Sequence, residues 1–353
     1  MDCPAAASAE GDSVVLLKTI AIIVVILLVL LLGVGMLLPR HSHVERSIVI
    51  EAPRATVFAL VDGFKQFKKW SPWAALDPNA TYTLEGPEFG VGAKQSWVGD
   101  PKTVGSGSQE IVATQPGESV TSRLEFGEEG PATARFTLVP EAGGTRVTWS
   151  LDTDNGPGPI GRWFGLMIDH WVGPDYEKGL VNLKALAEKL PKADFADLTV
   201  TAVDAAPMTV AFVASQSSKD TAEIGEAIGA AYTKIVAFMK TEGLEQAGPP
   251  ITINTRWDDT GYGFDAAIPV DRAPAREIPA DSPVKVKRTY AGKALKIVFK
   301  GPYGGMPPSF AKLTAYMAAR GYEPAGPPWD EYVSDPGTTP EVELTTNIYQ
   351  PVK

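Results

Sequence analysis

The C-terminal part of the chain carries a carboxylate and two hydroxyl groups that could act together. Glu331 lies in the segment PPWDEY, and Tyr303 and Tyr349 stand before and after it in the sequence. A buried carboxylate with an adjacent proton donor is the arrangement that general acid–base catalysis requires. The same carboxylate in an aromatic cleft would attract an organic cation. A structure that turned these side chains toward solvent would count against an enzyme.

Four tryptophans in the N-terminal half are candidates for a ligand cavity. They are Trp70, Trp73, Trp97 and Trp149. Indole rings line apolar pockets and can hydrogen-bond a polar group of the ligand. The competing role is packing in the core and at its corners.

Composition excludes several classes of protein. The formal net charge of −10 disfavours nucleic acid, since phosphate binding needs concentrated Lys and Arg. One cysteine, Cys3, permits no internal disulfide, and three histidines leave little for metal chemistry. No Gly-rich run ends in GK[ST], no GxGxxG opens a βαβ unit, and neither HExxH nor GxSxG occurs. We therefore predict no cofactor and no metal.

Residues 19–38, TIAIIVVILLVLLLGVGMLL, are predicted to form a transmembrane helix behind a short N-terminal tail, residues 1–18. About 20 apolar residues in a helix span the hydrocarbon thickness of a bilayer. A cleaved signal peptide and a buried core helix are the alternatives. Lys18 precedes this segment, and Arg40, Arg46 and Arg54 follow it. This bias favours a single-pass protein of the bacterial inner (plasma) membrane with cytoplasmic soluble domains, although a periplasmic or extracellular body stays open.

Residues 43–190 are predicted to form the first soluble domain. An alternating strand at 43–51 is followed by a helix that begins near Pro53. Short strand-like runs separated by Gly and Pro then predict a meandering antiparallel sheet. A long helix over about 159–190, broken or bent at Gly173-Pro174, closes the domain. This order is a helix-grip arrangement, in which a curved sheet wraps around a long helix.

Four segments of this domain resemble the polyketide cyclase-like branch of the START-like (SRPBCC) superfamily. They are RSIVIEAPRATVFALV, KKWSPW, GGTRVTW and IDHWVGPDYEKGLVNLK. The resemblance spans nearly all of residues 43–190 and implies an internal hydrophobic pocket. It does not imply one reaction, because members include lipid carriers, cyclases, dehydratases and chaperone regulators.

A linker at 191–204 leads to a second domain, residues 205–353, that contains a quasi-repeat. Each copy reads as a strand, a helix, a Gly-Pro-Pro segment and a hairpin. Two such units imply pseudo-two-fold symmetry with a ligand cleft where the halves meet. The fold class is therefore α+β for both domains. The expected helices are 221–242 and 309–320, the second ending at Gly321.

The run from Lys300 to Val352 resembles the gyrase-inhibitor-like small-molecule-binding domain, over roughly 205–353. That family also forms the effector-binding part of multidrug-responsive transcription regulators, but no helix-turn-helix pattern precedes it here. The resemblance implies an aromatic-lined cleft for amphipathic, often cationic, molecules. Some members are reported to hydrolyse strained cyclopropane-containing toxins. The candidate ligand-binding residues are Asp265, Tyr303, Trp329, Glu331, Tyr332, Asn347 and Tyr349.

One position departs from the family pattern. Asn347 stands where the family usually carries a Glu before the Ile-Tyr pair. Asn can only hydrogen-bond, which weakens the cation-binding and the hydrolytic hypotheses alike. Asp265 in the symmetry-related strand is an alternative source of charge, unless it is merely an exposed strand carboxylate.

Three hypotheses follow. The leading one is a membrane-anchored binder of hydrophobic or amphipathic small molecules, in a sensor, sequestration or carrier role. The alternative is an enzyme on such molecules, either a START-like cyclase or hydratase or a C-terminal hydrolase of electrophilic toxins, with Glu331 as the weak catalytic candidate. The third is a signalling or assembly protein, which a large exposed apolar patch outside both pockets would favour.

Overall fold

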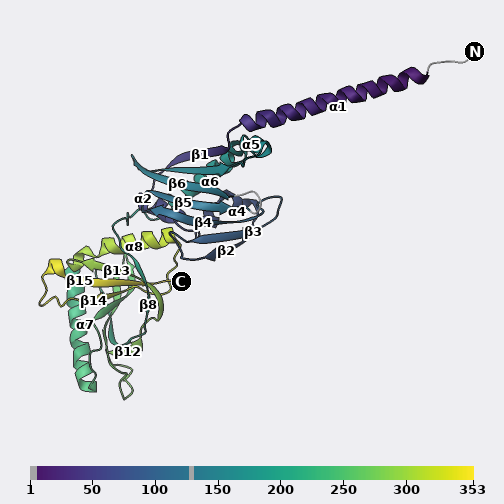
Figure 1. The fold of residues 1–353 in the computed structure, drawn as a ribbon. Coiled ribbons are helices and arrows are strands. Elements are labelled where there is room, and N and C mark those ends of the chain that lie inside the picture. The colour runs from purple at the N-terminus through teal and green to yellow at the C-terminus, as the bar shows by residue number, and fades with distance from the viewer. Residues whose placement is uncertain (1–5, 127–130) are drawn as a thin grey trace, which may run out of the picture. The chain divides into compact units, whose positions relative to one another are not determined.

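A computed structural model of the chain describes residues 6–126 and 131–353 (Figure 1). Cys3 lies outside the described residues. The chain divides into two compact units, residues 1–189 and 190–353. Each unit is built on one antiparallel sheet.

The first element is a long apolar helix, α1 (Ala6–Leu37). Within it, residues 15–37 are long and apolar enough to cross a membrane. Its large side chains are exposed, as with Leu27 at 59%. A core helix would bury them, so α1 is a candidate membrane span or a signal sequence.

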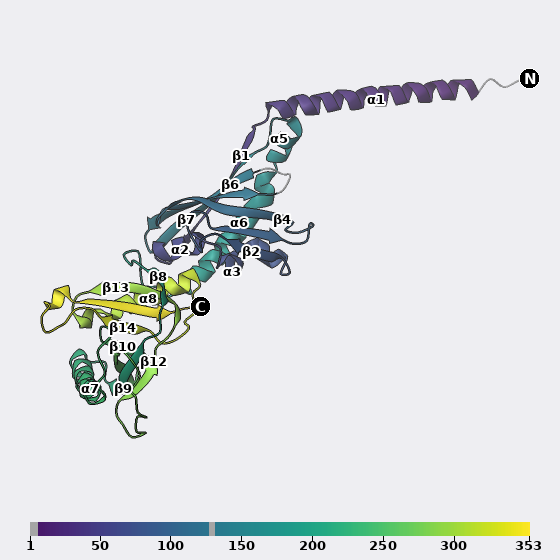
Figure 2. The same ribbon diagram turned by 60° about the horizontal axis from the view of Figure 1, so that its bottom comes forward.

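The first unit holds a seven-stranded sheet in the order β1-β7-β6-β5-β4-β3-β2, curled against α6 (Figures 1 and 2). Short helices follow β1, and α5 and α6 follow β7. The strands are β1 (His41–Ile50), β2 (Thr81–Glu85), β3 (Lys94–Val98), β4 (Ser106–Gln115), β5 (Ser119–Glu125), β6 (Pro131–Glu141) and β7 (Gly144–Asp154), and the helices are α2 (Arg54–Val61), α3 (Phe67–Trp70), α4 (Pro72–Leu76), α5 (Pro159–Gly165) and α6 (Ile168–Ala187).

The closing helix was predicted to break or bend at Gly173-Pro174, but the structure interrupts it earlier in the sequence. The chain leaves the helix after Gly165 and re-enters it at Ile168, and α6 then continues through Pro174. Pro174 falls in the second turn of α6, so the carbonyl that its missing N–H leaves free is that of His170, which is exposed to solvent. Water can satisfy that carbonyl, which lowers the cost of the proline.

The second unit holds an eight-stranded sheet in the order β12-β9-β11-β10-β14-β15-β13-β8. The two predicted repeats are β9–α7–β10–β11 and β13–α8–β14–β15, and they meet at the β10–β14 pair. The elements are β8 (Thr201–Ala205), β9 (Thr209–Ser217), α7 (Thr221–Glu242), β10 (Ile251–Asp258), β11 (Gly261–Pro269), β12 (Lys285–Arg288), β13 (Gly292–Lys300), α8 (Pro307–Arg320), β14 (Trp329–Tyr332) and β15 (Thr345–Pro351). β8 begins inside the segment expected to be a linker, and it pairs with β13.

Local signals account for the ends of the two helices. The Asp220 side chain accepts hydrogen bonds from the backbone N–H groups of Ala222 and Glu223, which caps α7. Gly243 and Gly321 end α7 and α8 in the left-handed region, at φ 63° and φ 73°.

The sheet of the second unit buries apolar side chains on both faces. Ala211, Phe264 and Ile268 pack with Ile235 of α7 on one face. Val210, Ile253 and Trp329 pack together on the other. Because alternate residues of a strand point to opposite faces, one residue of register decides which face a functional side chain joins.

Candidate functional site

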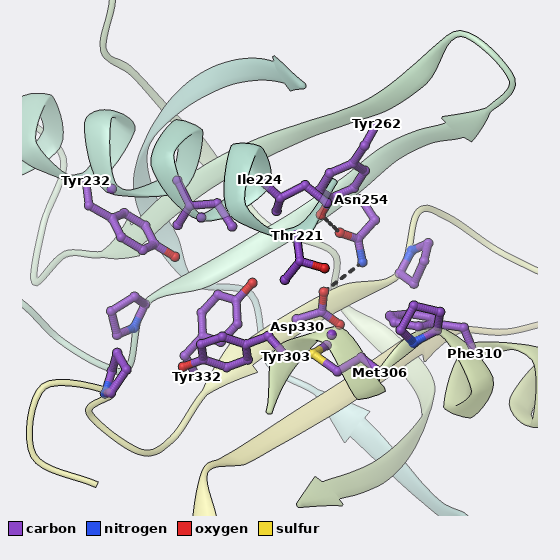
Figure 3. A pocket seen from close by; sticks show the side chains of 18 of the residues that line it. Thr221, Ile224, Tyr232, Asn254, Tyr262, Tyr303, Met306, Phe310, Asp330 and Tyr332 are labelled. Atoms are coloured by element: carbon purple, nitrogen blue, oxygen red, sulfur yellow. Dashed lines mark hydrogen bonds between the residues drawn. The ribbon is translucent and has the colours of Figure 1, made fainter. Parts of the chain in front are cut away.

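A cleft of about 1200 Å³ lies in the second unit and takes its walls from both repeats. Ile224 and Tyr232 of α7 face Tyr303, Met306 and other residues of the second repeat across it (Figure 3). This volume suits a drug-sized ligand with space left for water. The remaining lining residues include Ile228, Pro249, Pro250, Trp257, Phe310 and Pro328, so the walls are mainly apolar.

A single buried carboxylate, Asp330, stands in this cleft (Figure 3). The residue is 4% exposed. Its Oδ2 accepts hydrogen bonds from Asn254 Nδ2 at 3.0 Å and from Thr252 Oγ1 at 3.3 Å. Its Oδ1 is buried and has no hydrogen-bond partner among the residues that the structure describes. One oxygen is thus held by the protein, and the other is desolvated without a compensating hydrogen bond, which is a costly state for a polar atom.

Burial changes the acid–base behaviour of this group. Desolvation raises the pKa of Asp330 to about 7, against the lowering effect of its hydrogen bonds from Asn254 and Thr252. A carboxyl group with this pKa changes charge near neutral pH. An organic cation beside Oδ1 would favour the charged form and lower the pKa again.

Tyrosine hydroxyls surround the carboxylate. Tyr262 donates to Asn254 Oδ1, which orients the amide so that its Nδ2 faces Asp330 (Figure 3). The Tyr332 hydroxyl pairs with Thr252 Oγ1 at 2.9 Å. Burial raises the pKa of both tyrosines above the usual value, so these hydroxyls stay neutral. The cleft therefore offers neutral donors and aromatic faces around one ionisable acid.

The cationic side chains at the rim have other partners. Lys219 Nζ lies 5.3 Å from the ring centroid of Trp257, and Arg256 Nε lies 3.8 Å from Asp258 Oδ2. Among the residues that the structure describes, no Lys, Arg or His forms an ion pair with Asp330, so no protein cation neutralises the charge of that carboxylate.

The first unit, by contrast, is filled with aromatic rings. Trp149 stacks on Tyr176 with ring centroids 3.8 Å apart, and Trp70 and Trp73 meet Trp149 edge-on at 5.6 and 5.7 Å. The cavity left among them is about 30 Å³. That is room for about one water molecule. The indole N–H groups of Trp70 and Trp149 are buried without a hydrogen-bond partner in the described part of the chain, which suits such a water.

Two family models match these two units. Residues 41–188 match the family described as polyketide cyclase / dehydrase and lipid transport, and residues 199–353 match the GyrI-like small molecule binding domain. The chain carries an SRPBCC domain followed by a GyrI-like domain. Both are domains of small-molecule-binding types. This confirms the two resemblances and the fold class expected from the sequence.

Solved structures with a similar fold include the EcmrR C-terminal domain, a hydrolase from Listeria innocua and the Aha1 dimer from Colwellia psychrerythraea. Their identities are 15%, 17% and 15%, and their TM-scores are 0.36, 0.33 and 0.31. The matches cover 44%, 44% and 42% of this chain, and 98%, 92% and 96% of those chains. None of the curated proteins matches the sequence. No activity transfers at these identities and scores.

Of the residues singled out in the GyrI-like domain, Tyr303 and Tyr332 line the cleft. Their rings meet edge-to-face with centroids 5.3 Å apart. Glu331 is bonded elsewhere, to Asn347 Nδ2 at 2.6 Å and the Tyr349 hydroxyl at 3.2 Å. None of these three is among the lining residues of the cleft. Burial, and then the charge of Glu331, raises the pKa of Tyr349 to about 12.

The remaining two candidates of the GyrI-like domain also lie outside the cleft lining. Asp265 pairs with Lys287, and Trp329 stacks on Tyr349 with centroids 4.7 Å apart. Trp329 and Glu331 alternate with Asp330 and Tyr332 along β14, so the first two share the face opposite the cleft.

Asp330 itself was missed by the sequence reasoning, although it stands next to Glu331. Both belong to the four-residue strand WDEY, which contains apolar or aromatic residues on each face. Alternation therefore does not say which carboxylate faces α7. The pairing of Asp330 with Thr252 on β10 decides it.

Three of the four candidate tryptophans of the SRPBCC domain line the small cavity, and the fourth lies outside it. Trp70, Trp73 and Trp149 form the cluster around the small cavity. Trp97 stands apart, with its ring 5.9 Å from that of Phe126 and its N–H donating to the Val104 carbonyl. The hydrophobic pocket that the resemblance implies is reduced here to the 30 Å³ cavity, because the aromatic rings occupy the space.

We expect Trp149→Ala to open this domain to small aromatic molecules. Removal of a buried Trp costs about 3–5 kcal/mol of stability and leaves a cavity. Indole should then raise the melting temperature of the variant and leave that of the native chain unchanged. Trp97→Ala, outside the cluster, is the matched control. A stabilising effect of indole on the native chain would show that the domain already holds an accessible pocket.

Proposed function

We propose that the chain is a membrane-anchored binding protein for amphipathic organic cations, which the GyrI-like domain takes into its cleft. The observation that carries this is Asp330, a buried carboxylate with one unpartnered oxygen in an apolar, aromatic cleft of about 1200 Å³. An uncompensated buried charge is costly, and a desolvated cation beside it removes that cost. The aromatic walls contribute cation–π attraction and apolar burial.

The departure at Asn347 does not remove the acid from this domain. Asn347 bonds Glu331 on the face opposite the cleft, whereas Asp330 supplies the carboxylate on the cleft face. Cation binding is thus assigned to Asp330 in place of the family's usual Glu position. The same geometry disfavours Glu331 as an acid or base for a ligand in the cleft.

Anchoring is the second part of the proposal. Residues 15–37 would span the bilayer and hold both domains near molecules that partition into it. Amphipathic cations concentrate at the membrane surface, so an anchored binder meets them at high local concentration. A sensor, a sequestering protein and a carrier would all use this arrangement.

A pair of ions of like shape and opposite charge tests the proposal. We expect the full chain in lipid nanodiscs to bind tetraphenylphosphonium, measured by equilibrium dialysis with empty nanodiscs as the blank. Tetraphenylborate, nearly the same in size and apolar surface, should bind at least about tenfold more weakly, because its charge repels ionised Asp330. Equal binding of the two ions above the blank would contradict a site selected by charge.

A further inference from the structure

A group of large apolar side chains is exposed where the SRPBCC domain meets α1. Ile160 and Phe164 of α5 are 64% and 58% exposed, and Trp171 of α6 is 51% exposed. Leu166 and Met167, between the two helices, are also exposed. We call these five residues the α5–α6 patch. A contiguous exposed apolar patch rimmed by polar groups marks a site of contact with a protein or a membrane.

Two side chains of α5 that lie beside the patch residues in sequence, Arg162 and Trp163, join this helix to the end of α1. Trp163 Nε1 donates to the Leu31 carbonyl at 3.0 Å, and Arg162 Nη1 donates to the Met36 carbonyl at 2.5 Å. Arg162 also reaches the Leu38 carbonyl at 3.2 Å. The last carbonyls of a helix lack partners within it, so the guanidinium satisfies groups that would be costly to leave unpaired in an apolar medium.

A glycine of α1 makes this approach possible. A Cβ at Gly35 would lie 2.7 Å from Pro159 Cβ and 2.8 Å from Trp163 Nε1. Gly35 is the one buried residue in the last turns of α1, whose neighbours Val34 and Met36 are exposed. The helices α1 and α5 lie side by side at this point in both views (Figures 1 and 2).

The position of the Trp163–Leu31 contact along α1 gives the depth at which the α5–α6 patch would lie in the bilayer. Leu31 lies six residues before the end of α1 at Leu37. At 1.5 Å per residue, the indole of Trp163 is about 9 Å inside that end of the helix. If residues 15–37 span the bilayer, this contact lies among the acyl chains, about 7 Å below the headgroup boundary and within the depth that interfacial helices reach.

We propose that α5 and the first turn of α6 are a second membrane contact, whose apolar patch inserts among the acyl chains next to the headgroups of the bilayer that α1 spans. This rests on the anchoring part of the proposed function. The occupant is lipid, because the patch lies on the helix that contacts the apolar span and is joined to it by the side chains of Trp163 and Arg162. Interfacial helices bury their apolar face about 5–10 Å into this boundary.

The consequence is that the SRPBCC domain has a fixed position at the membrane surface. We call this second membrane contact, made by α5 and the first turn of α6, the seat. A span joined by a loose linker would let the domain move away from the surface, whereas Trp163 and Arg162 join it directly to the span. The strand β1 leaves α1 beside this seat, and its pairing from His41 with Asp154 of β7 continues the connection into the sheet.

Fluorescence depth measurement on the full chain in nanodiscs tests this seat. In a Cys3→Ser background, an environment-sensitive label is attached at Phe164→Cys and quenched by phosphatidylcholine with a nitroxide near the headgroup. Val139→Cys is the control: Val139 is 51% exposed and pairs with Arg146, at the end of the sheet away from His41. We expect at least about threefold stronger quenching at 164 than at 139, since only position 164 would lie within the lipid.

A third label at Leu28→Cys, quenched by phosphatidylcholine with a nitroxide on its acyl chain, separates the seat from the anchor. Leu28 lies nine residues before the end of α1 at Leu37, about 13.5 Å inside it, so a headgroup nitroxide would not reach it. Quenching at 28 and at 164 but not at 139 supports the proposal. Quenching at 28 with none at 164 overturns the seat and leaves the anchor intact. A label at 164 that is shielded from water but not quenched by the lipid also overturns it, because a protein surface then covers the patch. Absence of quenching at all three positions overturns both the seat and the anchor.

Discussion

Asp330→Asn should weaken the binding of tetraphenylphosphonium by about 30- to 100-fold at pH 8. A buried charge-assisted contact contributes about 2–3 kcal/mol, and asparagine keeps the shape of the side chain while removing its charge. The hydrogen bonds from Asn254 and Thr252 can still be accepted by the amide oxygen of the new side chain. Equilibrium dialysis of the full chain in nanodiscs measures the loss directly.

The pH dependence of the same binding identifies the group. The pKa of Asp330 is about 7, so lowering the pH from 8 to 6 protonates most of the carboxylate and should weaken cation binding about tenfold. The variant should show no such dependence. Glu331→Gln is the matched control, since Glu331 lies on the opposite face and is bonded to Asn347. A large loss in that control, with Asp330→Asn unaffected, would place the cation on the other face of the sheet.

The same substitution should stabilise the GyrI-like domain at alkaline pH. The folded-state pKa of Asp330, about 7, lies above its ordinary value of 3.8, which is the reverse of a salt-bridged aspartate. The folded domain therefore holds a proton that the unfolded chain releases, and stability falls as pH rises from about 4 to 7. Linkage makes the full cost of ionisation about 4 kcal/mol above pH 7. Asparagine carries no such cost.

Hydrogen exchange in β10 and β14 measures this effect within the domain that contains the residue. We expect the advantage of Asp330→Asn in opening free energy to grow by about 3 kcal/mol between pH 5 and pH 8. Asp265→Asn provides a contrast, because Asp265 is paired with Lys287 and loses an ion pair when neutralised. A difference between Asp330→Asn and the native chain that does not change with pH would mean that Asp330 is not protonated in the folded domain.

Much of the architecture was accessible from the sequence because its signals are local. Twenty consecutive apolar residues, the helical spacing of apolar residues in α7, the glycine that ends α8, and alternating runs bounded by Gly and Pro each act over a few residues. They predicted α7 over residues 221–242 and Gly321 at the end of α8, as the structure shows. Longer similarities over each half predicted the two families, which the family models confirm.

The chemistry of the site was decided by tertiary structure. In WDEY, a shift of one residue in register exchanges Asp330 and Glu331 between faces, and only the pairing with β10 and the packing of α7 select Asp330 for the cleft. Its hydrogen-bond partners Thr252 and Asn254 are more than seventy positions away in the sequence. Their bonds lower the pKa that burial in the folded domain raises.

The space inside the SRPBCC domain is likewise a tertiary property. Trp70, Trp149 and Tyr176 are distant in sequence, and only their stacking shows that they fill the interior that the family similarity led us to expect as a pocket. By itself the sequence determined the order of the long helices and of the main strands and the apolar segment of α1, because these follow from neighbouring residues. The edge strand β8 was not predicted, because it depends on pairing with β13. Contacts between distant residues decide which carboxylate faces the cleft and how far aromatic rings fill the SRPBCC interior, because register and packing depend on the whole sheet.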